Sequence, residues 1–235
     1  MRRLVVNADD LGRTPGINRG VADAVDLGVV TSASVMVRWP AARNIGAWSA
    51  DRPRGSLGMH FDLTELEFRD GEWTTVYCIV DPTDEHAVAE ELQCQLDRFA
   101  ALVGRPPTHL DSHQHVHTEE PVRSALVAAA MDLGVPLRSL TPDVRYEGAF
   151  YGQTGRGEPN AEGISVDAFI ALVSTLPDGV TELGCHPGDP AGLRSTYAME
   201  RAVELRTLCD SRVRDAIAAS GVDLASFADL ATSTS

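Results

Sequence analysis

LVVNADDLGRTPGINRGVADAVDLG, residues 4–28, holds one complete strand-and-helix unit. Its first part, LVVN (4–7), is a short apolar run typical of a buried strand. Thr14 and Pro15 follow as an N-cap residue and a proline at the first helical position. Gly28 is a stop signal at the end of the amphipathic segment. The stretch therefore predicts a buried strand, a short polar connection and a helix.

The same unit recurs along the chain. Further strands are expected at VVTSASVMV (29–37), SLGMHFD (56–62), THLD (108–111), VPLRSL (135–140), VTELGC (180–185) and GVDLASF (221–227). Helices are expected at 41–50, from Thr83 or Asp84 to Val103, at 121–133 with Thr118 as its cap, from Ser165 to Leu176, and at 196–219. About seven such units predict an α/β fold with a parallel sheet. Because no G-x-G-x-x-G turn follows a strand, a TIM-like (β/α) barrel is favoured over an open doubly wound sheet.

Composition excludes several classes of protein. The chain has 235 residues, 43% of them hydrophobic, which suits a single domain over 1–235. A net charge of −14 argues against binding nucleic acid or an anionic membrane, since both need a basic surface. All twenty basic residues are arginine, so there is no lysine for Schiff-base aldolase chemistry, PLP attachment or a P-loop.

Cysteine use and hydropathy indicate a cytoplasmic protein. The four cysteines are widely spaced and form no C-x-x-C pair, so we expect reduced thiols that are mostly buried. The apolar run at the N-terminus is far too short for a signal peptide. No segment approaches the roughly 18 apolar residues of a membrane span.

Polar side chains gather where four of the predicted strands end. These stretches are NADD (7–10), GMHFDL (58–63), DSHQHVH (111–117) and CHPG (185–188). Carboxyl ends of parallel strands meet at one face of the sheet, where α/β proteins hold their active sites. The chemistry is therefore expected at this face.

The histidine-rich run from 109 to 117 favours a metal site over a solvated loop. In an extended segment alternate residues share a face. On that basis one face would carry His109, Asp111, His113, His115 and His117. Imidazole and carboxylate groups on one face are suited to a metal ion.

NADDLG, GMHFDL, THLDSHQHVH and ELGCHPG together resemble the signatures of the YdjC-like family of carbohydrate deacetylases. The similarity runs in order from residue 4 to about 188 and includes TSASVMV and AFYGQ. The sequence departs from the family at Leu11, where Phe is usual, and in a short segment at 63–80. The resemblance implies a distorted (β/α) barrel with one divalent metal ion, magnesium or zinc, at its open end. It also makes a homodimer reasonable.

Carried over by motif, the metal ligands would be Asp10, His60 and His113. One carboxylate and two imidazoles leave open positions for water and substrate, as a catalytic site requires. We assign Asp9 as the general base and His186 as the general acid that protonates the departing amine. For Asp9 the alternative is a cap on the following turn, and for His60 a core histidine.

Five further residues are candidates for substrate contacts or for support of the ligands. Asp111 either orients a ligand imidazole or forms a structural salt bridge. His117 is interpreted as a substrate contact or a supporting group, and the role of His115 stays open. The glycine-rich segment 141–164 is expected to be a binding loop or lid, so Tyr151 within it and Arg138 before it are candidates for substrate contacts.

The predicted function is metal-dependent removal of an acetyl group from an N-acetylated amino sugar, glycan or glycolipid. A small molecule or an oligosaccharide would be the partner, with no nucleic acid and no membrane span. One alternative is a metallophosphoesterase on a similar barrel, and the other is a non-catalytic sugar- or metal-binding protein. Cys185 is expected to be a buried thiol and no nucleophile, while His86 and His109 are expected to take no part in catalysis.

Overall fold

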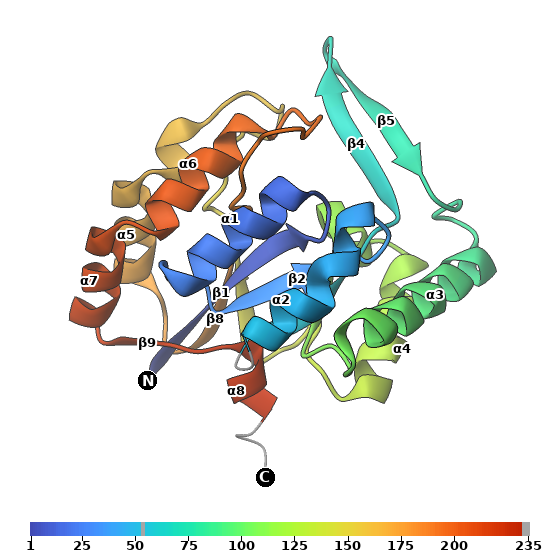
Figure 1. The fold of residues 1–235 in the computed structure, drawn as a ribbon, viewed down its shortest axis with the longest axis horizontal. Coiled ribbons are helices and arrows are strands. Elements are labelled where there is room, and N and C mark those ends of the chain that lie inside the picture. The colour runs from blue at the N-terminus through green and yellow to red at the C-terminus, as the bar shows by residue number, and fades with distance from the viewer. Residues whose placement is uncertain (53–54, 232–235) are drawn as a thin grey trace.

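A parallel sheet wrapped by helices forms the body of the molecule in a computed structural model that describes residues 1–52 and 55–231 (Figure 1). Its strands are β1 (Arg2–Leu11), β2 (Ser32–Val35), β3 (Ser56–Phe61), β6 (Leu110–Ser112), β7 (Val144–Glu147), β8 (Gly179–Cys185) and β9 (Val222–Leu224). They are arranged in the order β6-β3-β2-β1-β8-β7, and β9 also pairs with β1. Every pairing between these strands is parallel. The predicted α/β barrel class is confirmed, and the barrel is distorted because the pairings of the described strands end at β6 and β7.

The helices cover the outside of the curled sheet (Figure 1). They are α1 (Pro15–Asp26), α2 (Ile45–Asp51), α3 (Glu85–Val103), α4 (Val122–Leu133), α5 (Val166–Thr175), α6 (Met199–Leu208), α7 (Ser211–Ala219) and α8 (Phe227–Ala231), with 3₁₀ turns η1 (Pro40–Asn44), η2 (His113–Thr118) and η3 (Ala161–Ile164). Thr14, Asp84 and Ser165 cap α1, α3 and α5 through their side-chain oxygens, as predicted. No helix among the described residues is both long and apolar enough to cross a membrane.

Strand β1 lies at the centre of the sheet and is buried from Leu4 to Leu11. A central strand of a parallel sheet is covered on both faces, which explains the apolar run at residues 4–6 near its start. Helix α1 packs closely on the connection after β8, because a Cβ at Gly20 would lie 2.5 Å from Cα of Gly188. Glycine at position 20 therefore allows the segment that follows His186 to lie directly against the first helix.

The strand predicted at 135–140 is wrong. Leu137 forms a single bridge to Leu110, and the chain then turns at Ser139, whose φ is 61°. Left-handed backbone ends an extended run. On the side of β8 away from β1 the neighbouring strand is β7, which lies inside the segment 141–164 that was predicted to be a binding loop or lid.

The helical predictions need two corrections. The segment 196–219 is two helices, because Asp210 is extended and its side chain caps α7. Thr118 does not cap α4, since its hydroxyl donates to the carbonyl oxygen of His115. The first error comes from assigning one helix by periodicity and overlooking that the side chain of Asp210 accepts an N–H at the start of α7.

A hairpin that we did not predict projects from the body (Figure 1). It is formed by β4 (Thr64–Arg69) and β5 (Glu72–Cys78) around a two-residue turn, Asp70-Gly71, with φ values of 51° and 88°. Asp-Gly is a frequent pair in such turns and was the available sequence signal.

The cysteines are unpaired, as expected, but they are not mostly buried. Cys78 and Cys94 are exposed and Cys209 is partly exposed, so only Cys185 matches the predicted environment. The two exposed thiols lie on β5 and on the outer part of α3, and the apolar character of cysteine did not bury them.

Candidate metal and catalytic site

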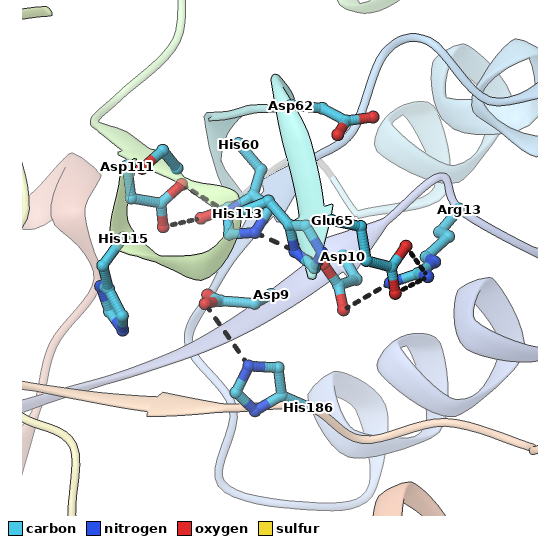
Figure 2. Close-up of polar contacts among 12 residues, drawn as sticks. Asp9, Asp10, Arg13, His60, Asp62, Glu65, Asp111, His113, His115 and His186 are labelled. Carbon is cyan, nitrogen blue, oxygen red and sulfur yellow. Dashed lines mark hydrogen bonds and ion pairs between the residues drawn. The ribbon is translucent and has the colours of Figure 1, made fainter. Parts of the chain in front are cut away.

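The four polar stretches that end predicted strands meet at one face, as expected (Figure 2). Asp9 and Asp10 come from β1, His60 from β3, His113 from the turn after β6, and His186 from the residue after β8. These residues come together although the four stretches are far apart in the sequence. Parallel strands put their carboxyl ends together whatever their spacing in sequence.

Asp10, His60 and His113 form a tight buried cluster. Oδ1 of Asp10 lies 3.2 Å from Nδ1 of His113 and 3.4 Å from Nε2 of His60. Two atoms that bind one ion at about 2.0–2.2 Å are themselves roughly 3–3.5 Å apart. Oδ1 of Asp10 is buried and accepts no hydrogen bond. The three residues therefore fit a divalent metal ion, and their mixed oxygen and nitrogen donors suit either zinc or magnesium.

A local distortion of β1 lets adjacent aspartates serve one site. Asp10 has φ of 66°, and the pairing of β1 with β2 shifts register between Ala8 and Leu11. On a regular strand Asp9 and Asp10 would point to opposite faces. The left-handed residue turns both carboxylates toward the cavity. Burial opposes ionisation of Asp10, but Arg201 and His113 outweigh it and hold its pKa well below the usual range.

Asp111 contacts both the imidazole of His60 and the guanidinium of Arg138. Its Oδ1 lies 2.8 Å from Nδ1 of His60, which leaves Nε2 of that ring facing Asp10. Its Oδ2 lies 2.8 Å from Nη2 of Arg138 and accepts from the hydroxyl of Ser34 at 2.6 Å. Burial disfavours a charged His60, yet Asp111 and Asp9 outweigh it and raise the pKa of His60 to about 10.

Asp9 is held by Arg138 through both of its oxygens, at 2.6 and 2.7 Å. Nδ2 of Asn7 donates to the same carboxylate at 3.0 Å. Burial raises the pKa of Asp9, but Arg138 outweighs burial and lowers it, so Asp9 is ionised at neutral pH. These contacts fix the direction of the carboxylate and leave Oδ2 3.8 Å from Nε2 of His186.

Arg138 does not reach the cavity. It is 3% exposed and contacts three carboxylates, those of Asp9, Asp111 and Glu182. Glu182 was not predicted as part of the site. Burial raises the pKa of Glu182 to about 7, even though Arg138 opposes the shift.

His186 stands between two carboxylates. Nε2 lies 3.8 Å from Oδ2 of Asp9, and Nδ1 lies 3.8 Å from Oε1 of Glu204. Glu204 also accepts from the backbone N–H of His186 and from the hydroxyl of Tyr197. A proton on either ring nitrogen would therefore have a counter-charge nearby. The neighbouring Cys185 is fully buried, and burial raises the pKa of its thiol well above the ordinary value, which argues against a cysteine nucleophile.

The predicted alternation along 109–117 holds only to Ser112. Gln114 and His115 have φ of 53° and 55°, so the chain leaves the strand and coils as η2. His115 lines the cavity and lies against Tyr146, with Nε2 3.4 Å from the hydroxyl. His117 is buried behind the site, and Nδ1 of its ring lies 2.6 Å from the hydroxyl of Ser112.

The remaining predicted residues divide between the cavity and the outside of the site. Tyr151 lines the cavity, stacks on Tyr197 at 4.6 Å and lies 5.5 Å from the ring of His186. His109 is buried against Ser34 and Phe227 and does not line the cavity. His86 is exposed on α3.

Two buried arginines near the Asp-His-His cluster were not predicted from the sequence. Arg201 donates to Oδ2 of Asp10, and Arg13 lies 3.9 Å from the same oxygen (Figure 2 shows Arg13). Arg13 also binds both oxygens of Glu65 at 2.6 Å. A weak signal for Arg13 was its place three residues after NADD, whereas nothing in the sequence singled out Arg201 or Glu204.

The Asp-His-His cluster, Asp9 and His186 face one cavity of about 820 Å³. It is lined by Asp9, Asp10, His60, His113 and His186 at its floor. Aromatic side chains and the hairpin form its sides. The size falls within the range of roughly 300–1,000 Å³ that is usual for small-molecule sites.

Residues 3–219 match the family of YdjC-like proteins. A chitooligosaccharide deacetylase of Yersinia pestis (strain Pestoides F) is 34% identical over 248 aligned positions, which cover 96% of this chain and 98% of that protein. A solved structure from Enterococcus faecalis V583, described as a candidate cellobiose-phosphate cleavage protein, has a TM-score of 0.79 at 24% identity and covers 97% of this chain and 98% of its own.

The same fold extends to more distant structures. A family 4 carbohydrate esterase from Streptomyces lividans in complex with acetate has a TM-score of 0.57 at 14% identity, over 95% of this chain and 91% of its own. A family 4 acetyl xylan esterase from Clostridium thermocellum, in complex with a cobalt ion, has a TM-score of 0.56 at 12% identity, over 98% and 91%. At these identities the likeness concerns the fold alone. The match over most of its length shows that the chain belongs to the family of YdjC-like proteins.

Proposed function

We propose that this protein is a metal-dependent carbohydrate N-deacetylase acting on N-acetylated amino sugars. The observation that carries the proposal is the placement of an Asp-His-His cluster and an Asp9–His186 pair around one cavity. The name of the Yersinia relative, a chitooligosaccharide deacetylase, supports the substrate class.

Asp10, His60 and His113 would hold the ion. A divalent ion held there would supply a Lewis acid for the acetamide carbonyl and would make water more acidic. Asp111 keeps His60 in one orientation through Nδ1, and Arg201 holds Oδ2 of Asp10 so that Oδ1 stays directed at the two imidazoles. The cluster is thus formed before substrate arrives.

Asp9 and His186 are assigned the two proton transfers of amide hydrolysis. Asp9 accepts a proton from the water whose oxygen forms the new bond to the carbonyl carbon. His186 donates a proton to the nitrogen as the carbon–nitrogen bond breaks, which releases acetate and a free amine. Arg138 holds Asp9 ionised and in a fixed direction, and Glu204 holds the backbone of His186.

The arrangement favours this function over a phosphoesterase that uses several metals. A second group of possible ligands, formed by Asp9, His60 and Asp111, also lies close together. The guanidinium of Arg138 already supplies the positive charge there, at 2.6 Å from Asp9 and 2.8 Å from Asp111. A second ion would be repelled at that position.

The experiment that tests the proposal is acetate release from N-acetylglucosamine and chitooligosaccharides. Chelated protein would receive zinc, magnesium, manganese or cobalt ions, with p-nitrophenyl phosphate as the control substrate. We expect acetate release that depends on added metal and no phosphate release. Phosphate release without acetate would support the phosphoesterase, and metal binding without either product would support a non-catalytic binding protein.

A further inference from the structure

The β4–β5 hairpin forms one wall of the cavity. Glu65, Leu66, Glu67 and Phe68 from β4 and Trp73 from β5 line it. The outer part of the hairpin extends beyond the helices (Figure 1). Trp73 is 56% exposed although it lines the cavity, and its ring meets that of Phe68 edge-on at 5.5 Å. A large aromatic surface is thus left open at the outer end of the site.

The foot of the hairpin is tied to the face that carries the catalytic residues. Glu65 receives two hydrogen bonds of 2.6 Å from Arg13, which follows β1 (Figure 2). The hydroxyl of Tyr77 donates to Asp62, directly after β3, at 2.6 Å. These contacts join both strands of the hairpin to the ends of sheet strands.

Gln114 makes a third connection, to the backbone of β4. Its Oε1 accepts from the N–H of Leu66 at 2.8 Å, and its Nε2 donates to the carbonyl of Leu66 at 2.7 Å. Antiparallel pairs alternate in their hydrogen bonding, so the backbone groups of Leu66, three residues before the pair that closes the turn, point away from β5. The side chain of Gln114 therefore takes the place of a neighbouring strand.

The turn that carries Gln114 also carries His113. Gln114 and His115 both have left-handed backbone, which is unfavourable for residues other than glycine and persists where surrounding contacts enforce it. The two hydrogen bonds to Leu66 are such contacts. Through Gln114, the position of the hairpin wall is linked to the turn that presents a residue of the metal cluster.

Taking the deacetylase function proposed above as its basis, we propose that the hairpin selects substrates by chain length. Trp73 and Phe68 contact a sugar unit beyond the one that carries the reacting acetamide, and Gln114 positions that wall relative to His113. The acetamide lies at the floor, between Asp9, His186 and the Asp-His-His cluster. At about 820 Å³ the cavity is near the upper end of the range for small ligands, which leaves room for a second sugar unit.

The test is the ratio of kcat/KM for the trisaccharide of N-acetylglucosamine to that for the monosaccharide. We expect this ratio to be about 10 or more for the wild type, which is the effect of one aromatic contact. Trp73→Ala should reduce this ratio toward 1 mainly through KM. Val76→Ala is the matched control, because Val76 is 49% exposed on the same strand and does not line the cavity. A wild-type ratio near 1, or an unchanged ratio in Trp73→Ala, would overturn the proposal.

Gln114→Ala and Gln114→Gly separate the effect of the two hydrogen bonds to Leu66 from the effect of the left-handed backbone at Gln114. Glycine tolerates the left-handed conformation but cannot bind Leu66. We expect both variants to lose chain-length preference and to show faster amide hydrogen exchange over 64–69 than wild type. A Gln114→Gly protein with wild-type preference and wild-type exchange would show that Gln114 does not position the wall.

Binding measured without turnover distinguishes failure of this proposal from failure of the deacetylase function. Calorimetry with the Asp9→Asn protein should show tighter binding of the trisaccharide than of the monosaccharide, and adding Trp73→Ala should weaken trisaccharide binding about tenfold. If wild type releases no acetate but this difference is found, the hairpin proposal stands and the catalytic one fails. Equal binding of the two sugars, alongside acetate release, would reject the hairpin proposal alone.

Discussion

The floor of the cavity and its hairpin wall are built on opposite principles. At the floor, buried carboxylates share one buried guanidinium, so every charge depends on a partner. At the outer wall, Trp73 is 56% exposed and is paired with Phe68 within the hairpin itself. Loss of a partner at the floor leaves an uncompensated buried charge, whereas truncation at the outer wall only exposes surface to water. The floor is therefore suited to fixed chemistry and the wall to variation in substrate.

Arg138→Met should have the largest effect. It removes the cation shared by Asp9, Asp111 and Glu182, and breaking a buried ion pair from one side costs about 3–5 kcal/mol. Urea unfolding would measure the change, with Arg145→Met, an exposed arginine on β7, as the control. A loss as small as that of the control would mean that the carboxylates of the floor do not depend on Arg138.

Substitutions at Asp9 and Asp10 should show that one residue acts in catalysis and the other in metal binding. Asp9→Asn is expected to lower kcat by about 10²–10⁴-fold, the usual contribution of a general base, with metal content unchanged. Asp10→Asn should lose the metal itself. Metal analysis and acetate release on the two proteins would check this, and metal loss in Asp9→Asn would show that the roles of the two residues are reversed.

His109, beneath the floor, should make stability sensitive to acid. Burial lowers the pKa of His109 to about 4, from an ordinary value near 6.5. The contribution of the neutral, buried His109 to the free energy of unfolding is complete above pH 6.5. It falls between pH 6.5 and 4, because there the unfolded chain binds a proton that the folded protein does not.

His109 alone should change the free energy of unfolding by about 1.4 kcal/mol per pH unit within this range. Urea unfolding of chelated wild type and His109→Gln at pH 7, 6 and 5 would isolate it, since His115 and His117, whose pKa values burial also lowers to about 4, are common to both proteins. Equal slopes would mean that folding does not lower the pKa of His109. His86→Gln, at an exposed position on α3, is the control.

Trp73→Ala should have the smallest effect on stability. The side chain is 56% exposed, and surface substitutions of this kind usually change the free energy of unfolding by less than about 0.5 kcal/mol. A much larger loss, measured by urea unfolding, would show that the hairpin tip is part of the core and would remove the contrast between wall and floor.

The expected arrangement of strand ends and helix caps agrees with the structure where the argument rested on short stretches of sequence. Asp10, His60 and His113 were predicted to lie at one face because each is at or near the carboxyl end of a buried strand, and parallel strands end together. The same argument placed His186. Helix caps at Thr14, Asp84 and Ser165 were readable because the capping side chain lies within three residues of the N–H that it accepts from.

Ion pairs between residues far apart in the sequence could not be predicted. Arg138 and Asp9 are 129 residues apart, and Arg201 and Asp10 are 191 apart. Arg138 was expected near substrate, but the turn at Ser139 and the curl of the sheet direct it beneath Asp9. The hydrophobic periodicity of the sequence does not predict such a contact, because the contact depends on the position of a whole helix or strand in the fold.

The amino-acid order of this chain thus determined the strand-and-helix alternation, the polar strand ends and the residue types suited to a metal, since these depend on backbone geometry over a few neighbours. Tertiary packing decided which carboxylates share Arg138, which ring nitrogen of His186 faces Asp9, and how Gln114 reaches Leu66. Those outcomes rest on the curl of the sheet and on the left-handed turn after His113, and neither feature is encoded in any short stretch.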